Sequence, residues 1–123
     1  PATLLVICSL LAAARWAMLS ASASLAVVVP AQLLHAATFA AFHIAAVTQT
    51  HRLFAADLRA SGQALYSALT YGAGTVVGTF GSGALFDGAG PWLTFGASSL
   101  IALVAAGLLL AFRRRAGAEI VTE

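Results

Sequence analysis

The chain has 123 residues, of which 61% are hydrophobic and 8% are charged, and its formal net charge is +2. A soluble domain carries about 25% charged residues, so this composition argues against an ordinary soluble protein and indicates one that lies in a lipid bilayer. The single cysteine, Cys8, excludes an internal disulfide, and the local arginine cluster 113–115 is too isolated to indicate nucleic-acid binding.

Four apolar stretches are long enough to cross a bilayer, which takes about 20 residues of helix. We expect transmembrane helices at residues 2–19, 25–48, 61–85 and 92–112, followed by a basic tail at 113–123. No basic region precedes the first stretch, so it does not have the pattern of a signal peptide. Pro91 suits the first turn of the last helix, directly after a tight turn at 87–90. The predicted fold class is all-α, a polytopic membrane protein with four transmembrane helices.

The arginines predict the orientation of these helices. Arg52 and Arg59 lie between the second and third helices, and residues 113–115 follow the fourth, whereas the connections on the other side carry no basic residue. Cytoplasmic connections are enriched in Lys and Arg. We therefore expect the long connection and the C-terminus to be cytoplasmic, in a bacterial inner membrane. Trp16 and Trp92, near helix ends, fit the interfacial aromatic belt.

Three ionisable residues interrupt the apolar stretches, namely Arg15 in the first and His35 and His43 in the second. An arginine at the centre of a membrane helix costs at least about 2.5–3.5 kcal/mol, so such groups usually mark a pathway for a solute, ion or proton. The alternative for Arg15 is that its long side chain reaches the headgroups without any function. His43 could likewise be only a hydrogen-bond partner between helices.

In the second and third apolar stretches, polar residues are spaced so that they share one face of the helix. In the second stretch, Gln32, His35, Phe39 and His43 are spaced i, i+3, i+7 and i+11, which keeps them on one side of a helix. This face is expected to line either a helix contact or a water-filled cavity. In the third stretch a similar face begins with polar side chains and continues with glycines, which favour close helix packing; its members are Gln63, Tyr66, Thr70, Gly74, Gly78 and Gly81.

The pattern resembles the last four helices, nine to twelve, of a major facilitator superfamily transporter, in the branch of the phenylpropionate permeases and, more distantly, the lactose permease. The likeness covers nearly the whole chain up to the arginine tail. The residues that carry it are Arg15-Trp16, Gln32-Leu33-Leu34-His35 with Phe39 and His43, residues 63–68, and Gly83, Asp87 and Gly90.

This resemblance implies that the four helices are part of a C-terminal six-helix bundle and that the other helices of the same transporter are their partners. In the sugar permease branch the ninth helix carries an arginine, matched by Arg15, and the tenth a histidine, matched by His35. The glutamate three residues later falls on Thr38, which cannot carry a proton. The proton would then ride on His35, His43 or a carboxylate elsewhere, and histidine has a suitable unperturbed pKa of about 6.5.

We therefore expect proton-coupled uptake of a small organic solute by alternating access. The planar guanidinium of arginine suits a carboxylate, which favours an aromatic carboxylate over a sugar. No nucleophile–base pair, metal-ligand spacing or phosphate loop indicates an enzyme or a cofactor. The alternatives are a sugar or nucleoside symporter, a membrane scaffold, and a small oligomeric four-helix exporter. The predicted pathway consists of Arg15, Gln32, His35, Phe39, His43, Gln63 and Tyr66.

Overall fold

The computed structural model describes the backbone of residues 1–119 and the side chains of residues 1–114. The described residues form helices and short connections, so the predicted all-α fold class is confirmed. The far end of the predicted basic tail, with the side chains of Arg115 and Glu119 and residues 120–123, lies outside the described part. The elements in chain order are α1 (Ala2–Ala21), α2 (Leu25–Leu53), the 3-10 turn η1 (Ala56–Leu58), α3 (Arg59–Ser67), the π-helical turn η2 (Ala68–Ala73) and α4 (Gly74–Glu119).

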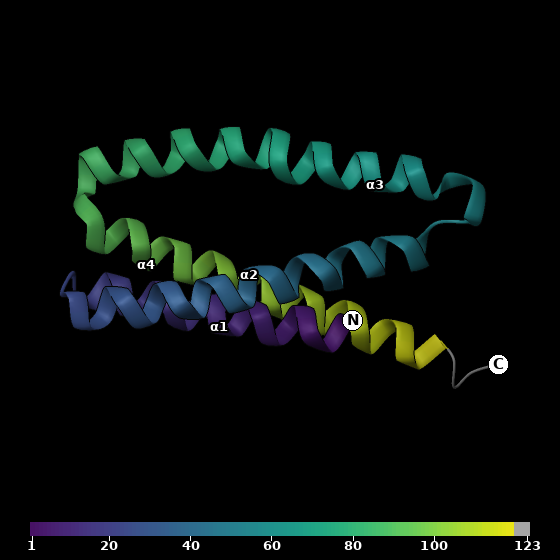
Figure 1. The fold of residues 1–123 in the computed structure, drawn as a ribbon, viewed down its shortest axis with the longest axis horizontal. Coiled ribbons are helices and arrows are strands. Elements are labelled where there is room, and N and C mark those ends of the chain that lie inside the picture. The colour runs from purple at the N-terminus through teal and green to yellow at the C-terminus, as the bar shows by residue number, and fades with distance from the viewer. Residues whose placement is uncertain (120–123) are drawn as a thin grey trace.

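The helix α4 is bent back on itself at Gly90. Gly90 has φ 82° and ψ 174°, a backbone conformation that is essentially open to glycine alone. Figure 1 shows the resulting reversal at the end of the molecule opposite the connection between α2 and α3. We call residues 59–89, from α3 to this reversal, the arm, and residues 91–119 the return limb. The predicted third and fourth transmembrane stretches fall on the arm and on the return limb.

The apolar lengths agree with a membrane location. The stretches Ala2–Ala21, Leu25–Leu53 and Ala56–Arg114 are each long and apolar enough to cross a membrane. The last of them spans 59 residues and contains the reversal at Gly90, so its two limbs run in opposite directions. The described chain thus offers four apolar helical limbs.

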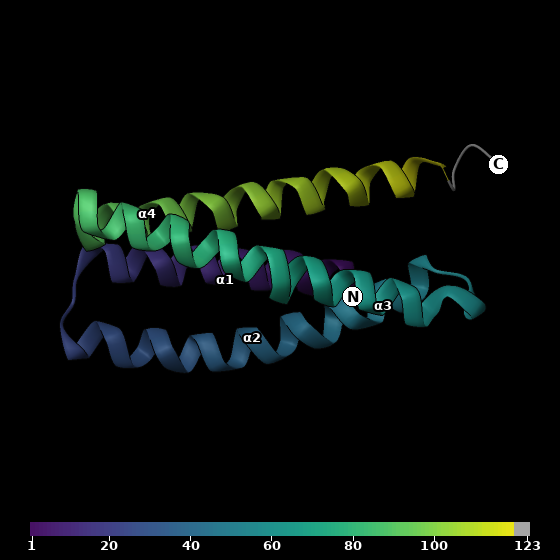
Figure 2. The same cartoon turned by 90° about the horizontal axis from the view of Figure 1, so that it is seen from above.

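The helix α1 lies between α2 and the return limb, as Figure 2 shows. Small buried side chains allow these helices to approach closely, and among them are Ala13, Ala31, Ala45 and Ala106. Two hydrogen bonds join α1 to the return limb. The Ser99 hydroxyl donates to the Ala13 carbonyl at 2.8 Å, and the Ser20 hydroxyl donates to the Trp92 carbonyl at 2.7 Å. These hydrogen bonds hold the second half of α1 against the first part of the return limb.

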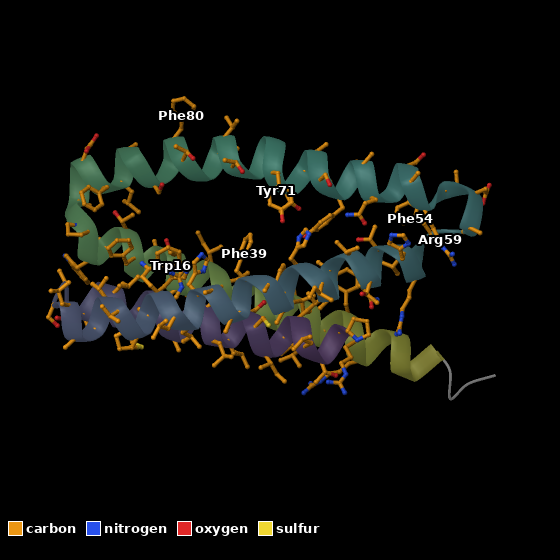
Figure 3. All side chains as sticks on the ribbon, viewed as in Figure 1. Trp16, Phe39, Phe54, Arg59, Tyr71 and Phe80 are labelled. Carbon is orange, nitrogen blue, oxygen red and sulfur yellow. The ribbon has the colours of Figure 1, made fainter. Side chains whose placement is uncertain are left out.

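The arm runs beside this group of helices and meets it mainly near its two ends (Figure 1). At one end α3 packs on α2, and at the other Phe86 contacts Phe95 of the return limb. Phe80 in the middle of the arm is 77% exposed and points away from the other helices (Figure 3). Within the described chain, the outer face of the arm is therefore uncovered.

The start of α1, the connection between α2 and α3 and the described end of α4 lie toward the same end of the molecule (Figure 1). Arg52 and Arg59 flank that connection, and Arg113 lies in the last part of α4. The arginines that predicted the orientation are thus gathered at one end, and the turn at 22–24 and the reversal at Gly90 form the other.

The start of the arm depends on a close contact between Gly62 and Phe54. A Cβ atom on Gly62 would lie 2.5 Å from a ring carbon of Phe54, and Gly62 itself is buried. We expect Gly62→Ala to lower the stability of the protein by about 1–3 kcal/mol, because the ring has to move out of a packed position. The measurement is the thermal unfolding midpoint of the purified protein.

Gly107→Ala is the matched control for Gly62→Ala, because a Cβ atom there meets nothing within 4 Å. Alanine also has the higher helix propensity, so this variant should unfold at the wild-type temperature or slightly above it. Equal midpoints for the two variants would contradict the importance of the Phe54 contact.

Candidate functional site

The Arg15 side chain is buried on α1 with only 5% of its surface exposed. Its guanidinium carbon lies 3.8 Å from the centroid of the neighbouring Trp16 ring, which is a cation–π contact. The Nε atom is buried and has no hydrogen-bond partner within the described part of the chain. The indole thus stabilises one face of the cation, while at least one N–H group at its edge is left without an acceptor.

Two cavities meet at Arg15. The first has a volume of about 350 Å³ and is lined by residues of α1, α2 and the return limb, including Arg15, Trp16, His35, Thr38 and Phe39. The second, of about 500 Å³, lies toward the Gly90 end, and its lining includes Arg15, Trp16, Gln32, Trp92 and Phe95. The structure therefore brings the predicted residues Arg15, His35 and Phe39 to one cavity and Gln32 to its neighbour.

The hydroxyl groups that line the first cavity are bonded to their own helices. Thr38 donates to the Leu34 carbonyl at 2.7 Å, and Ser9 donates to the Leu5 carbonyl at 2.9 Å. Thr38 occupies the position at which the resemblance places a glutamate, and its hydroxyl is directed back along α2. Arg15 and His35 are consequently the principal polar groups that the cavity can offer to a solute.

Aromatic rings surround the cation on the side of the arm. Trp16 stacks on Phe95 with the ring centroids 5.6 Å apart, and Phe95 meets Phe86 edge-on at 6.5 Å. The His35 ring lies 5.6 Å from Phe39, and in Figure 3 both Trp16 and Phe39 extend toward the arm. Trp16, which the sequence predicts as an interfacial residue, also contacts both the cation and Phe95. Its place directly after an intramembrane arginine is the signal that could have shown this role.

A second cluster joins α2 to the arm around His43. The Tyr71 hydroxyl oxygen lies 2.8 Å from His43 Nδ1, and the ring centroids of His43 and Tyr71 are 6.0 Å apart. Tyr66 completes the cluster, with its ring centroid 6.4 Å from His43 and 6.3 Å from Tyr71. The predicted residues His43 and Tyr66 are therefore in contact, and Tyr71 is a member that the sequence reasoning missed.

Gln63 is the predicted residue that stands apart from both groups. It lies on α3, partly buried, and its Oε1 atom has no hydrogen-bond partner among the described residues. It does not line either of the two cavities at Arg15. Among the described residues, no group of three or more His, Cys, Asp or Glu side chains could hold a metal ion.

Comparison with known proteins identifies the family of the chain. The model of the MFS_1 like family matches residues 2–97, a range that includes α1, α2, the whole arm and the start of the return limb. This range contains Arg15 and His35, which line the first cavity, and the cluster around His43. No curated protein and no solved structure matches the chain.

Proposed function

Because the chain belongs to the MFS_1 like family, we propose that it is the C-terminal part, helices nine to twelve, of a proton-coupled transporter that takes up a small aromatic carboxylate. The family and the apolar helices make it an integral membrane protein with a transport-related function. The observation that carries the narrower proposal is the buried Arg15, whose Nε atom lacks a partner within the described chain.

A buried positive charge such as that of Arg15 is stabilised by an anion beside it. The four carboxylate residues of the chain are Asp57, Asp87, Glu119 and Glu123. Asp57 and Asp87 lie near opposite ends of the arm, and neither of them lines the two cavities at Arg15. A solute carboxylate would accept two parallel hydrogen bonds from the guanidinium edge, an arrangement that arginine provides and lysine does not. Trp16 supports this by holding one face of the guanidinium and leaving its edge available.

The lining of the cavity favours an aromatic or apolar body for this solute. Trp16 and Phe39 line the cavity of about 350 Å³, which is at the lower end of the range for sites that hold small molecules. A sugar needs many hydrogen-bond partners, but the Ser9 and Thr38 hydroxyls are bonded to their own helices. This arrangement favours an aromatic carboxylate over the sugar or nucleoside alternative.

The proton carriers in this proposal are His35 and His43. His35 shares the cavity with Arg15, so a proton on its ring would be repelled by the guanidinium unless a bound carboxylate lay between them. Binding of the anion would therefore favour binding of the proton at His35, and by linkage the proton would favour the anion to the same extent. This mutual dependence is what a symporter of an acid requires.

Alternating access would use these helices as part of one six-helix half. His35 and Gln32 are exposed in the described structure, and polar side chains facing lipid are costly. We therefore propose that further helices of the same transporter cover this face. The arginines gathered near the termini would place that end, including the C-terminus, in the cytoplasm of a bacterium.

The proposal is tested by uptake of labelled 3-phenylpropionate into vesicles that contain the native transporter. We expect an inwardly directed proton gradient to accelerate uptake several-fold, and a protonophore to abolish that acceleration. A labelled hexose and a nucleoside serve as competing solutes and should not be taken up. Uptake of either of them in place of the acid, or uptake that ignores the proton gradient, would contradict the proposal.

A further inference from the structure

Among the residues with described side chains, the bond between Tyr71 and His43 is the one side-chain hydrogen bond that joins the arm to α2. The Tyr71 ring extends from the arm toward α2 (Figure 3), and its oxygen lies 2.8 Å from His43 Nδ1. Tyr66 and Tyr71 are the titratable groups of the arm that face His43. Through this contact, Tyr71 of the arm constrains the orientation of the His43 ring.

The titratable groups of α1, which also packs on α2, lie elsewhere. Cys8 and Arg15 line the cavity of His35, and His43 does not take part in that lining. Among the residues with described side chains, the rings in contact with His43 are thus the two phenols of Tyr66 and Tyr71. A hydrogen bond to one of these phenols is then the main constraint on the orientation and tautomer of the imidazole.

The π-helical turn η2 explains how Tyr71 reaches His43. Residues five apart in an α-helix point about 140° away from each other, since each residue turns the helix by 100°. In a π-helix the hydrogen bond runs from i to i+5, so residues five apart lie nearly one above the other. Tyr66 and Tyr71 are five residues apart. The π-helical turn Ala68–Ala73 begins two residues after Tyr66 and contains Tyr71, so it brings Tyr71 round toward the side of Tyr66, and both rings contact His43.

The direction of the hydrogen bond follows from the chemistry of its two atoms. A phenolic O–H is a stronger acid than an imidazole N–H, and an imidazole nitrogen is a stronger acceptor than a phenolic oxygen. We infer that Tyr71 is a positioning residue for His43, whose hydroxyl donates to Nδ1, keeps the proton of the neutral ring on Nε2 and leaves the Nε2–H group to face the transport pathway. This inference rests on the proposed function, in which His43 belongs to that pathway.

The tautomer is measured by NMR on the native transporter, labelled with 15N-histidine and held in lipid nanodiscs. His43→Gln identifies the signals of His43. We expect the neutral wild-type ring to carry its proton on Nε2, Tyr71→Phe to give a mixture of both tautomers, and Tyr66→Phe to leave the wild-type tautomer in place. A wild-type proton on Nδ1, or a Tyr71→Phe spectrum identical to the wild type, would overturn the inference.

Uptake gives a second measurement of the same variant. Without this bond the ring of His43 is free to turn, so we expect Tyr71→Phe to lower the initial rate of uptake several-fold. Ser82→Ala removes a hydroxyl elsewhere on the arm and should leave that rate unchanged. A wild-type rate in Tyr71→Phe would contradict the role of Tyr71. Wild-type protein without proton-driven uptake would instead refute the proposed function, while the tautomer would still decide the inference.

Discussion

Replacement of Arg15 by alanine is expected to reduce uptake of the aromatic carboxylate by roughly 30- to 1,000-fold. Removal of one partner from a buried, hydrogen-bonded charge pair costs about 2–4 kcal/mol of binding free energy, which corresponds to that range. The loss should be largest at low solute concentration, because the missing interaction is one of binding. The measurement is the initial rate of uptake over a range of concentrations, corrected for the amount of transporter in the vesicles.

Two further variants separate the geometry of Arg15 from its charge. Arg15→Lys keeps the charge but loses the planar pair of donors, so its uptake should fall between those of alanine and wild type. Arg52→Ala removes an exposed arginine at the end of α2 and is expected to transport normally. If Arg15→Ala transported as fast as Arg52→Ala, the arginine would serve only packing, and the carboxylate proposal would be wrong.

The contribution of Arg15 to the binding of a carboxylate depends on how rigidly the residues around it are held. It lies on α1 two residues after Ala13, whose carbonyl accepts a hydrogen bond from Ser99 of the return limb. Trp16, directly beside it, is held by stacking on Phe95 of the same limb. The cation is thus fixed at the junction of α1 and the return limb, and a guanidinium fixed in advance loses less freedom when it binds a carboxylate.

The helices are predictable from the sequence wherever one periodicity holds over a long stretch. Apolar length and the helical period were enough to predict an all-α membrane chain, and the pairing of Arg15 with His35 came from the family resemblance. The chain reverses at Gly90, the last residue of the tight turn expected at 87–90 and directly before a proline that favours a helix start, whereas residues 87–89 stay helical.

The role of Tyr71 does not follow from the α-helical period. From Tyr66 that period selects Thr70, whereas in the structure the π-helical turn directs Tyr71 toward His43. Nothing in a single sequence marks such a turn. Gln63 shows a related limit, since a shared helix face cannot reveal that the residue sits beyond the two cavities at Arg15.

Gly90 provides the second prediction with a large expected effect. Its φ of 82° and ψ of 174° are closed to residues that carry a Cβ atom, so Gly90→Ala should destabilise the protein by about 1–3 kcal/mol. A Cβ atom at this position meets nothing within 4 Å, and the effect therefore arises from the backbone alone. If α4 relieved this strain by straightening, the arm would leave the return limb, and the contact between Phe86 and Phe95 would be lost.

Gly88→Ala tests this reasoning within the same turn. Gly88 also has open space around its Cβ position, but it lacks the positive φ of Gly90. Alanine should therefore be neutral or slightly stabilising at position 88 and clearly destabilising at position 90, as measured by the thermal unfolding midpoint and by uptake. A similar fall in the unfolding midpoint of both variants would mean that the segment tolerates no added methyl group. The positive φ of Gly90 would then not be what determines the reversal between the arm and the return limb.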